Sequence, residues 1–267
     1  NTQKTGFRIA VENTVKNLQK RGAVNIIEGT PRAYTVEQKR RVLLNFYKNN
    51  AIHCFVIPAI CVVAFFDTLK KRKSSQQSTT AFSVDFLNSA MTLRNVLKFE
   101  FFFSPRAIFT EEIKRTLNYF APGCPWETAS DQEWIRGFHE YFKDWDEATV
   151  YMGMLGELLE SYSTLMKYLK QNPGQISDKK QLSSQIVKFA QGLNEEGSLN
   201  FPESISVQNF SNGLLSCENK HYITTEKSGE QTLYKVSPWT HETEDRLRTI
   251  EDYLSLLIDR PAVLTGG

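Results

Sequence analysis

The chain has 267 residues, of which 40% are hydrophobic and 12% aromatic, enough apolar side chain for one large core or two smaller ones. Its 32 basic and 30 acidic residues leave a net charge of +2, which excludes a global field that draws the chain to nucleic acid or acidic lipid. Four cysteines without a C-x-x-C pattern are expected to be reduced and mostly buried thiols, and neither a metal nor a cofactor is indicated. Because the sequence begins at Asn1 and shows no leader pattern, we expect a piece of a longer protein.

Helix and hairpin patterns recur at the two ends of the chain. Apolar residues at helical spacing predict a helix over residues 7–20, which ends at Arg21 and Gly22. Two short strands, at 23–27 and 32–36, are expected to follow it around a turn. A similar arrangement is predicted near the other end, with a helix over 205–215 and paired strands at 222–225 and 232–236. The ends therefore look like winged helices.

The sequence between these ends reads as helical, with predicted helices at 37–48, 51–70, 84–103, 111–119, 131–143, 147–170 and 178–193. The apolar run 51–66 is about 16 residues long, short of the ~20 that span a bilayer, so we expect a buried helix. Ser83 is the expected start of one helix, and Ser130 with Glu133 forms a capping box for another. Six apolar positions in 147–170 repeat at spacings of four and three and predict a core-facing seam at Tyr151, Leu155, Leu158, Tyr162, Leu165 and Leu169.

These patterns together predict a mainly α fold, a multi-helix bundle with two small β-hairpins at winged-helix-like ends. A basic cluster, Lys70, Lys71, Arg72 and Lys73, runs into a polar low-complexity loop and gives the clearest break. We therefore divide the chain into a helix-hairpin unit with apolar helices (1–73), a polar loop (74–82), a helical bundle (83–200) and a C-terminal helix-hairpin-helix unit (201–267).

The most distinctive polar residues lie between two predicted helices, in the string Tyr47-Lys48-Asn49-Asn50-Ala51-Ile52-His53. Asparagine at such a junction ends one helix and caps the next by accepting from backbone N–H groups, and histidine can donate to a neighbouring carbonyl. We therefore expect Asn49, Asn50 and His53 to form a buried polar joint.

The order of these residues, together with Arg40 to Leu44 before them and Leu97 to Phe103 after the apolar helix, resembles the region that follows the catalytic domain in bacterial-type glycerol-3-phosphate acyltransferases. The resemblance covers about residues 20–105. It implies that Tyr47, Asn49, Asn50, His53 and Glu100 support the family's site. It also implies a C-terminal helical region of a glycerol-3-phosphate 1-O-acyltransferase of phospholipid biosynthesis, with an upstream catalytic domain and acyl-CoA or acyl-carrier protein as donor.

Two strings echo the catalytic motifs of that family, in which a histidine of an H-x4-D motif takes a proton from the glycerol hydroxyl and a later glycine-bearing segment holds phosphate. His139 and Asp144 satisfy the H-x4-D spacing, and Phe201-Pro202-Glu203-Ser204 follows in the right order. However, His139 lies in a helical pattern rather than after a strand, and Ser204 replaces the glycine. We interpret His139 as a surface or structural residue and expect no assembled catalytic site in this chain.

The basic cluster Lys70 to Lys73 has two readings, a solvated loop or a contact with anionic headgroups. The resemblance favours the contact and implies a peripheral position at the cytoplasmic side of a membrane. A competing hypothesis is a winged-helix module that binds nucleic acid or protein, suggested by the two helix-hairpin units. The near-neutral charge argues against nucleic acid as the partner.

Overall fold

The computed structural model describes residues 12–29, 33–37, 40, 44, 52–74, 80–142, 145–229 and 231–258, with no side chains described at 145–147. The chain divides into two compact units, Asn1–His53 and Cys54–Gly267. The boundaries that the sequence suggested near residues 74, 83 and 201 fall inside the second unit.

The first unit contains the predicted helix and hairpin. The described part of its helix runs over residues 12–20, and Gly22 follows it with a φ of +65°, a left-handed conformation that glycine adopts readily. Strand β1 (Asn25–Ile27) then pairs antiparallel with β2 (Ala33–Thr35), so the predicted hairpin is confirmed. Most of the helix predicted at 37–48 lies outside the described residues.

Helix α3 (Val56–Ser74) is the central helix of the second unit. Every residue from Ala59 to Leu69 is buried, because α4 (Phe82–Leu97), α5 (Arg106–Phe120), α7 (Trp145–Gly153) and α11 (His241–Ile258) pack against it. The prediction of a buried apolar helix is therefore confirmed. Pro58 stands in its first turn, where no backbone N–H is required. None of the helices among the described residues is long and apolar enough to cross a membrane.

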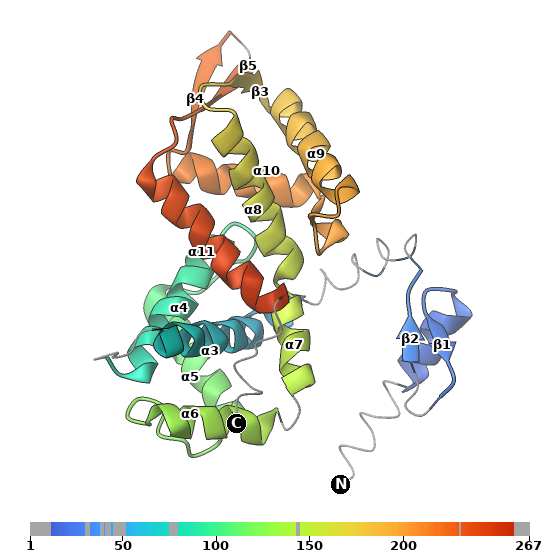
Figure 1. Ribbon diagram of the computed structural model, residues 1–267, viewed down its shortest axis with the longest axis vertical. Helices are drawn as coiled ribbons and strands as arrows, with labels where there is room; N and C mark the ends of the chain where they lie inside the picture. Colours follow the sequence, from blue (N-terminus) through green and yellow to red (C-terminus); the bar gives the residue numbers. More distant parts are fainter. Residues whose placement is uncertain are drawn as a thin grey trace. The chain divides into compact units, whose positions relative to one another are not determined.

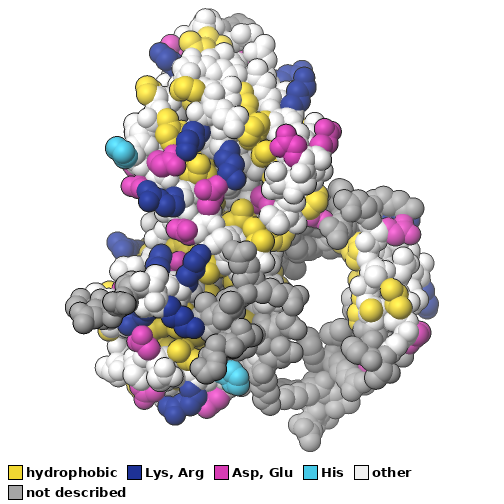
Figure 2. Space-filling model, viewed as in Figure 1, with side chains coloured by type: hydrophobic (Ala, Val, Ile, Leu, Met, Phe, Trp, Pro, Cys, Tyr) yellow, Lys and Arg dark blue, Asp and Glu magenta, His cyan; other side chains and the backbone are white. Residues whose placement is uncertain are grey.

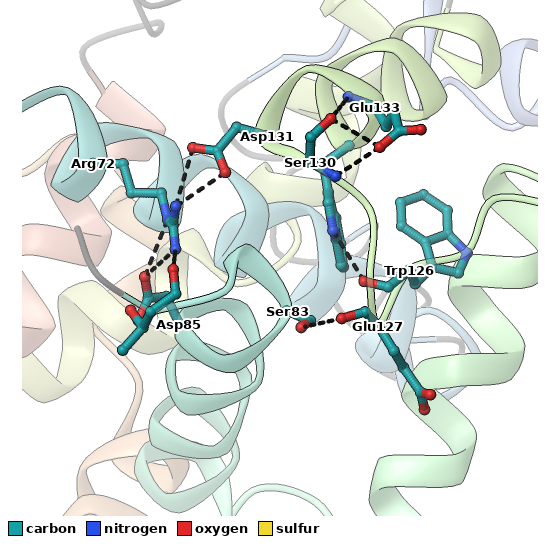
Figure 3. A network of polar contacts seen from close by, with 10 residues as sticks. Arg72, Ser83, Asp85, Trp126, Glu127, Ser130, Asp131 and Glu133 are labelled. Carbon is teal, nitrogen blue, oxygen red and sulfur yellow. Dashed lines mark hydrogen bonds and ion pairs between the residues drawn. The ribbon is translucent and has the colours of Figure 1, made fainter. Parts of the chain in front are cut away.

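An aromatic cluster joins α6 (Asp131–Tyr141) to α4. Trp134 is fully buried, and its ring lies 4.8 Å from that of Phe82 and 4.9 Å from that of Phe86, measured between centroids. The predicted capping box of Ser130 and Glu133 is present at the start of α6 (Figure 3). The predicted start at Ser83 is wrong, because α4 already begins at Phe82 and the Ser83 hydroxyl donates to the carbonyl of Glu127 instead.

Two predicted helices are shorter than expected. The helix predicted at 84–103 ends at Leu97, and α5 begins only after Pro105. The helix predicted at 147–170 is broken into α7 and α8 (Gly156–Gln171). The break lies at Met154 and Leu155, just before Gly156, where an added Cβ would lie 2.4 Å from the ring of Phe201. Only glycine allows the close approach there.

The seam of α8 is buried as predicted, apart from half-buried Tyr151 in α7. Helices α9 (Lys179–Glu195), α10 (Val207–Asn219) and α11 surround α8, as Figure 1 shows. The predicted C-terminal hairpin is confirmed as β4 (Ile223–Ser228) and β5 (Gln231–Val236). A short strand that the sequence did not predict, β3 (Ile176–Asp178), pairs with the other edge of β5.

The fold is therefore mainly helical with two small antiparallel sheets, as predicted. Its surface carries both charge signs. Figure 2 shows lysine and arginine side chains interspersed with acidic ones on the face that presents α11, in keeping with the small net charge. Two of the four cysteines, Cys61 and Cys217, are buried, whereas Cys54 is exposed.

Candidate functional site

Several predicted site residues lie outside the described part of the chain. These are Tyr47, Asn49 and Asn50 of the family-like string, and Asp144 of the H-x4-D spacing. His53 is described, and its side chain is exposed in a short 3-10 helix, Ile52–Cys54. The predicted burial of His53 in a polar joint is therefore wrong, whereas the roles predicted for Asn49 and Asn50 stay predictions.

His139 lies in the last turn of α6, and its side chain is exposed beside the buried Phe138. It follows a helical residue rather than the end of a strand. A catalytic base of an H-x4-D motif needs an orienting carboxylate and a substrate pocket nearby. His139 is not in the walls of the cavities beside Lys71, Trp126, Pro58 and Tyr162.

The Phe201-Pro202-Glu203-Ser204 segment forms a 3-10 turn, η2 (Pro202–Ser204), held by the carboxylate of Glu160. Glu160 is only 2% exposed. Its Oε1 accepts from the backbone N–H of Asn200 at 2.8 Å, and its Oε2 accepts from the N–H of Phe201 at 2.8 Å and from the Ser204 hydroxyl at 3.1 Å. The N–H groups that would hold a phosphate thus already donate to a carboxylate, whose charge would repel an anion.

A second set of hydrogen bonds fastens the same turn to α8 and α10. The Ser161 hydroxyl donates to the carbonyl of Ser204 at 2.6 Å, and the Asn209 side-chain amide donates to the Ser161 oxygen at 3.2 Å. All these groups are buried. The segment that echoes a phosphate-binding motif is therefore built as a structural joint between helices.

Glu100 follows α4 and is held by residues distant in sequence. The Tyr162 hydroxyl donates to its Oε1 at 2.9 Å, and the Asn212 amide donates to its Oε2 at 2.8 Å. Burial raises the pKa of the Glu100 carboxyl, although the hydrogen bonds from Asn212 and Tyr162 act in the opposite direction. Burial and the nearby Glu100 also raise the pKa of Tyr162. Of the five residues that the resemblance singled out, Glu100 alone has its partners described, and it ties the end of α4 to α8 and α10.

Arg72 stands apart from the three lysines of its cluster. Its guanidinium donates to both oxygens of Asp131 at 3.0 and 3.1 Å, and to Oδ2 of Asp85 at 2.8 and 3.1 Å (Figure 3). It also lies 5.4 Å from the centre of the Phe82 ring, and its side chain is only 12% exposed. Arg72 therefore fastens α3 to the first turns of α4 and α6. A bidentate arginine pair with carboxylates is a strong and directional contact.

The three lysines Lys70, Lys71 and Lys73 have exposed side chains at the end of α3. The ammonium of Lys71 lies 2.6 Å from the buried carboxylate of Asp67, and that of Lys70 donates to the Ser255 hydroxyl at 3.0 Å. Because these side chains are exposed, their ammonium groups remain accessible to solvent despite these contacts.

A polar cavity of about 390 Å³ lies beside this cluster, between α3, α4 and α11. Its wall is formed by Thr68, Lys71, Arg72, Asp85, Asn88, Ser89, Thr92, Thr249 and Tyr253. The Ser89 hydroxyl donates to Asp67 at 2.7 Å, and the Tyr253 hydroxyl donates to the Ser89 carbonyl at 3.2 Å. The wall contains no histidine or cysteine that could act as a base or nucleophile. Within the described ranges, no group of three His, Cys, Asp or Glu side chains is placed to hold a metal ion.

The sequence pointed to Glu100 and to the basic cluster, but it missed the residues that complete them. Tyr162 and Asn212 are 62 and 112 positions from Glu100, and Asp131 is 59 positions from Arg72. No local pattern indicates such pairs. The only available signal was the helical seam, which correctly placed Tyr162 in the core.

Comparison with curated proteins finds relatives for part of the chain. The chain is 29% identical over 110 residues to proteins assigned the name acyltransferase plsB1 in Mycobacterium bovis and Mycobacterium tuberculosis. The matched segment covers 40% of this chain and 17% of the length of each relative, so the similarity is confined to a small part of those proteins. The comparisons give no support to a winged-helix nucleic-acid module.

A family model covers much more of the sequence. The model described as glycerol-3-phosphate acyltransferase C-terminal region matches residues 5–226, which include the described helix and hairpin of the first unit and α3 to α10 of the second. The match thus spans the Glu100 contacts, the Arg72 ion pairs and the Glu160 joint. This chain belongs to the family of C-terminal regions of glycerol-3-phosphate acyltransferases.

Proposed function

We propose that this chain serves as the C-terminal region of an enzyme that transfers an acyl group from acyl-CoA or acyl-carrier protein to the 1-hydroxyl of glycerol 3-phosphate. The family match over residues 5–226 carries this proposal. In the complete enzyme, the helical region packs on a catalytic domain and helps to shape the groove for the acyl donor. The polar joints at Glu100 and Glu160 support this role, because carboxylates that accept hydrogen bonds from several elements hold helices in one arrangement.

The first prediction is that this chain alone does not transfer acyl groups, whereas a protein that joins it to the family's catalytic domain does. The reason is that His139 is exposed on a helix and that the 201–204 segment forms a structural turn rather than a phosphate site. The measurement is transfer from a thioester donor to glycerol 3-phosphate. Activity of this chain alone that is lost in His139→Ala would overturn the prediction. Equal activity of the catalytic domain with and without this chain would overturn the supporting role.

We further propose that the region lies against the cytoplasmic face of a membrane and that Lys70, Lys71 and Lys73 contact anionic headgroups. The exposure of these three side chains supports the proposal. Each basic residue close to such a surface contributes about 1 kcal/mol of attraction, which salt screens. Arg72 is left out of this contact because two carboxylates bind its guanidinium and its side chain is only 12% exposed, whereas that of Lys71, which pairs with Asp67, is 61% exposed.

The second prediction is that replacing Lys70, Lys71 and Lys73 by Gln strongly reduces flotation with vesicles that contain anionic lipid, with the largest loss at low salt. Three charges at about 1 kcal/mol each correspond to about a hundredfold loss of affinity. The matched control replaces Lys179, Lys180 and Lys188, three exposed lysines of α9, in the same way. If both triple variants float equally well, the lysine cluster is not the contact.

A further inference from the structure

Basic side chains from three helices meet where α4 and α10 end. Lys98 is the first residue after α4, Lys220 is the first after α10, and Arg246 lies in α11. The Lys98 ammonium donates to the Asn219 side chain at 2.6 Å, which joins the two helix ends. The Arg246 guanidinium donates to the carbonyl of Asn95, in the last turn of α4, at 3.3 Å. We call Lys98, Lys220 and Arg246 the basic triad.

The basic triad differs from Arg72 in its lack of described ion pairs. In the part of the chain that the structure describes, no carboxylate forms an ion pair with any of its three members. The pKa of Lys98 is lowered, first by burial and then by the positive charges of Lys220, Arg246 and Arg94. Glu100, the acidic residue closest in sequence to Lys98, instead accepts from Tyr162 and Asn212. The triad therefore carries uncompensated positive charge.

Helix dipoles explain only part of this arrangement. Cations are favoured at helix C-termini, where each helix contributes a partial charge of about −0.5. Two helix ends thus supply about −1 against the three charges of the triad and a fourth at Arg94. The Arg94 guanidinium donates to the Ser104 carbonyl and lies over the rings of Phe103 and Phe109, so it adds positive charge near the triad while its own contacts are with other groups. The contrast is Arg72, which two carboxylates neutralise.

We propose that Lys98, Lys220 and Arg246 form a binding site for a phosphate group. A phosphate monoester carries nearly two negative charges and accepts several hydrogen bonds, which suits two ammonium groups and an arginine fork that come from different helices. The phosphate belongs either to a free phosphorylated molecule or to a lipid headgroup, and both present the same chemistry to the triad. The site does not depend on the acyl-transfer proposal, because it uses none of the residues named there.

The test is calorimetric titration of the whole chain with inorganic phosphate. We expect saturable binding that weakens about tenfold in Lys98→Gln and in Lys220→Gln, since each change removes one charge-assisted hydrogen bond. Lys180→Gln, at an exposed lysine of α9, is the matched control and should bind as the unaltered chain does. Arg246→Gln should weaken phosphate binding more than either lysine variant does. Its thermal unfolding midpoint shows whether this variant is folded. If it is not, the variants at the exposed Lys98 and Lys220 still test the site.

A second arm separates the two sources of phosphate. Vesicles of phosphatidylcholine with phosphatidic acid present a phosphate monoester at a lipid surface. Binding to these vesicles that is lost in Lys98→Gln and Lys220→Gln, but kept in Lys180→Gln, assigns the site to a headgroup. Phosphate binding without vesicle binding assigns it to a free molecule. The proposal is overturned if phosphate does not bind saturably, or if Lys180→Gln weakens binding as much as Lys98→Gln.

Discussion

Replacing Glu160 by Ala is expected to lower the free energy of unfolding by about 3 to 5 kcal/mol, one of the two largest effects predicted for this chain. The variant loses the acceptor for the backbone N–H groups of Asn200 and Phe201 and for the Ser204 hydroxyl. The carboxylate and the Ser204 hydroxyl lie where water has little access, since Glu160 and Ser204 are 2% and 1% exposed, whereas Asn200 is exposed and Phe201 is half-buried. An unsatisfied buried donor costs about 1 to 3 kcal/mol, so three such losses reach the stated range even if water replaces part of the carboxylate.

Chemical denaturation of the chain measures this loss. Glu195→Ala, at an exposed glutamate near the end of α9, is the matched control and should change the free energy of unfolding by less than about 0.5 kcal/mol. Glu160→Gln should lower the free energy of unfolding by an amount between those of Glu160→Ala and Glu195→Ala. Its amide oxygen still accepts a hydrogen bond, whereas its NH₂ group faces a donor. A Glu160→Ala variant as stable as the control would show that the turn at 201–204 does not need the carboxylate.

The elements that the sequence predicted correctly are those whose signals are local. The capping box needs only Ser130 and Glu133, three positions apart, and the buried helix α3 is evident from one continuous apolar run. The hairpins follow from short apolar strands around turn residues. In each case the residues that determine the structure are neighbours in the chain.

The wrong or missing predictions concern elements whose bounds depend on residues far away in the sequence. The apolar spacing continues across the break at Met154 and Leu155 and so does not reveal it, and no local pattern indicates that Gly156 lies against the ring of Phe201, 45 positions away. Strand β3 has three residues and forms because the edge of β5 is available to it. Ser83 has a suitable side chain for an N-cap, but the N-cap is Ala81, two residues earlier, and the Ser83 hydroxyl donates to the carbonyl of Glu127 instead.

The candidate site shows the same division between local and distant information. The sequence could find Glu100 by resemblance and the basic cluster by composition. It could not tell that Arg72 differs from Lys70, Lys71 and Lys73, because the carboxylates that bind it come from other helices. From the sequence alone, the 201–204 segment could be either a phosphate-binding turn or a structural turn. The hydrogen bonds to the buried carboxylate of Glu160 show that it is a structural turn.

The other large effect follows from that difference. Arg72→Met is expected to lower the free energy of unfolding by about 2 to 3 kcal/mol, whereas Lys73→Gln should change it by less than about 0.5 kcal/mol. Methionine keeps much of the apolar contact with Phe82 but leaves Asp85 and Asp131 without their partner. Breaking a fully buried pair costs about 3 to 5 kcal/mol, and the lower figure applies because these carboxylates are 31% and 45% exposed and can be hydrated.

A double-mutant cycle distinguishes the ion pair from simple loss of packing. If the guanidinium and Asp131 are coupled, Asp131→Asn destabilises the unaltered chain more than it destabilises Arg72→Met, by about 1 kcal/mol or more. The effect should persist in high salt, because a pair with a 12% exposed arginine is screened much less than a surface pair. Additive losses in the cycle would contradict the structural role of the pair. In that case Arg72 would count with Lys70, Lys71 and Lys73 as a fourth charge that can contact a headgroup. Arg72→Met would then weaken vesicle binding and leave the free energy of unfolding nearly unchanged.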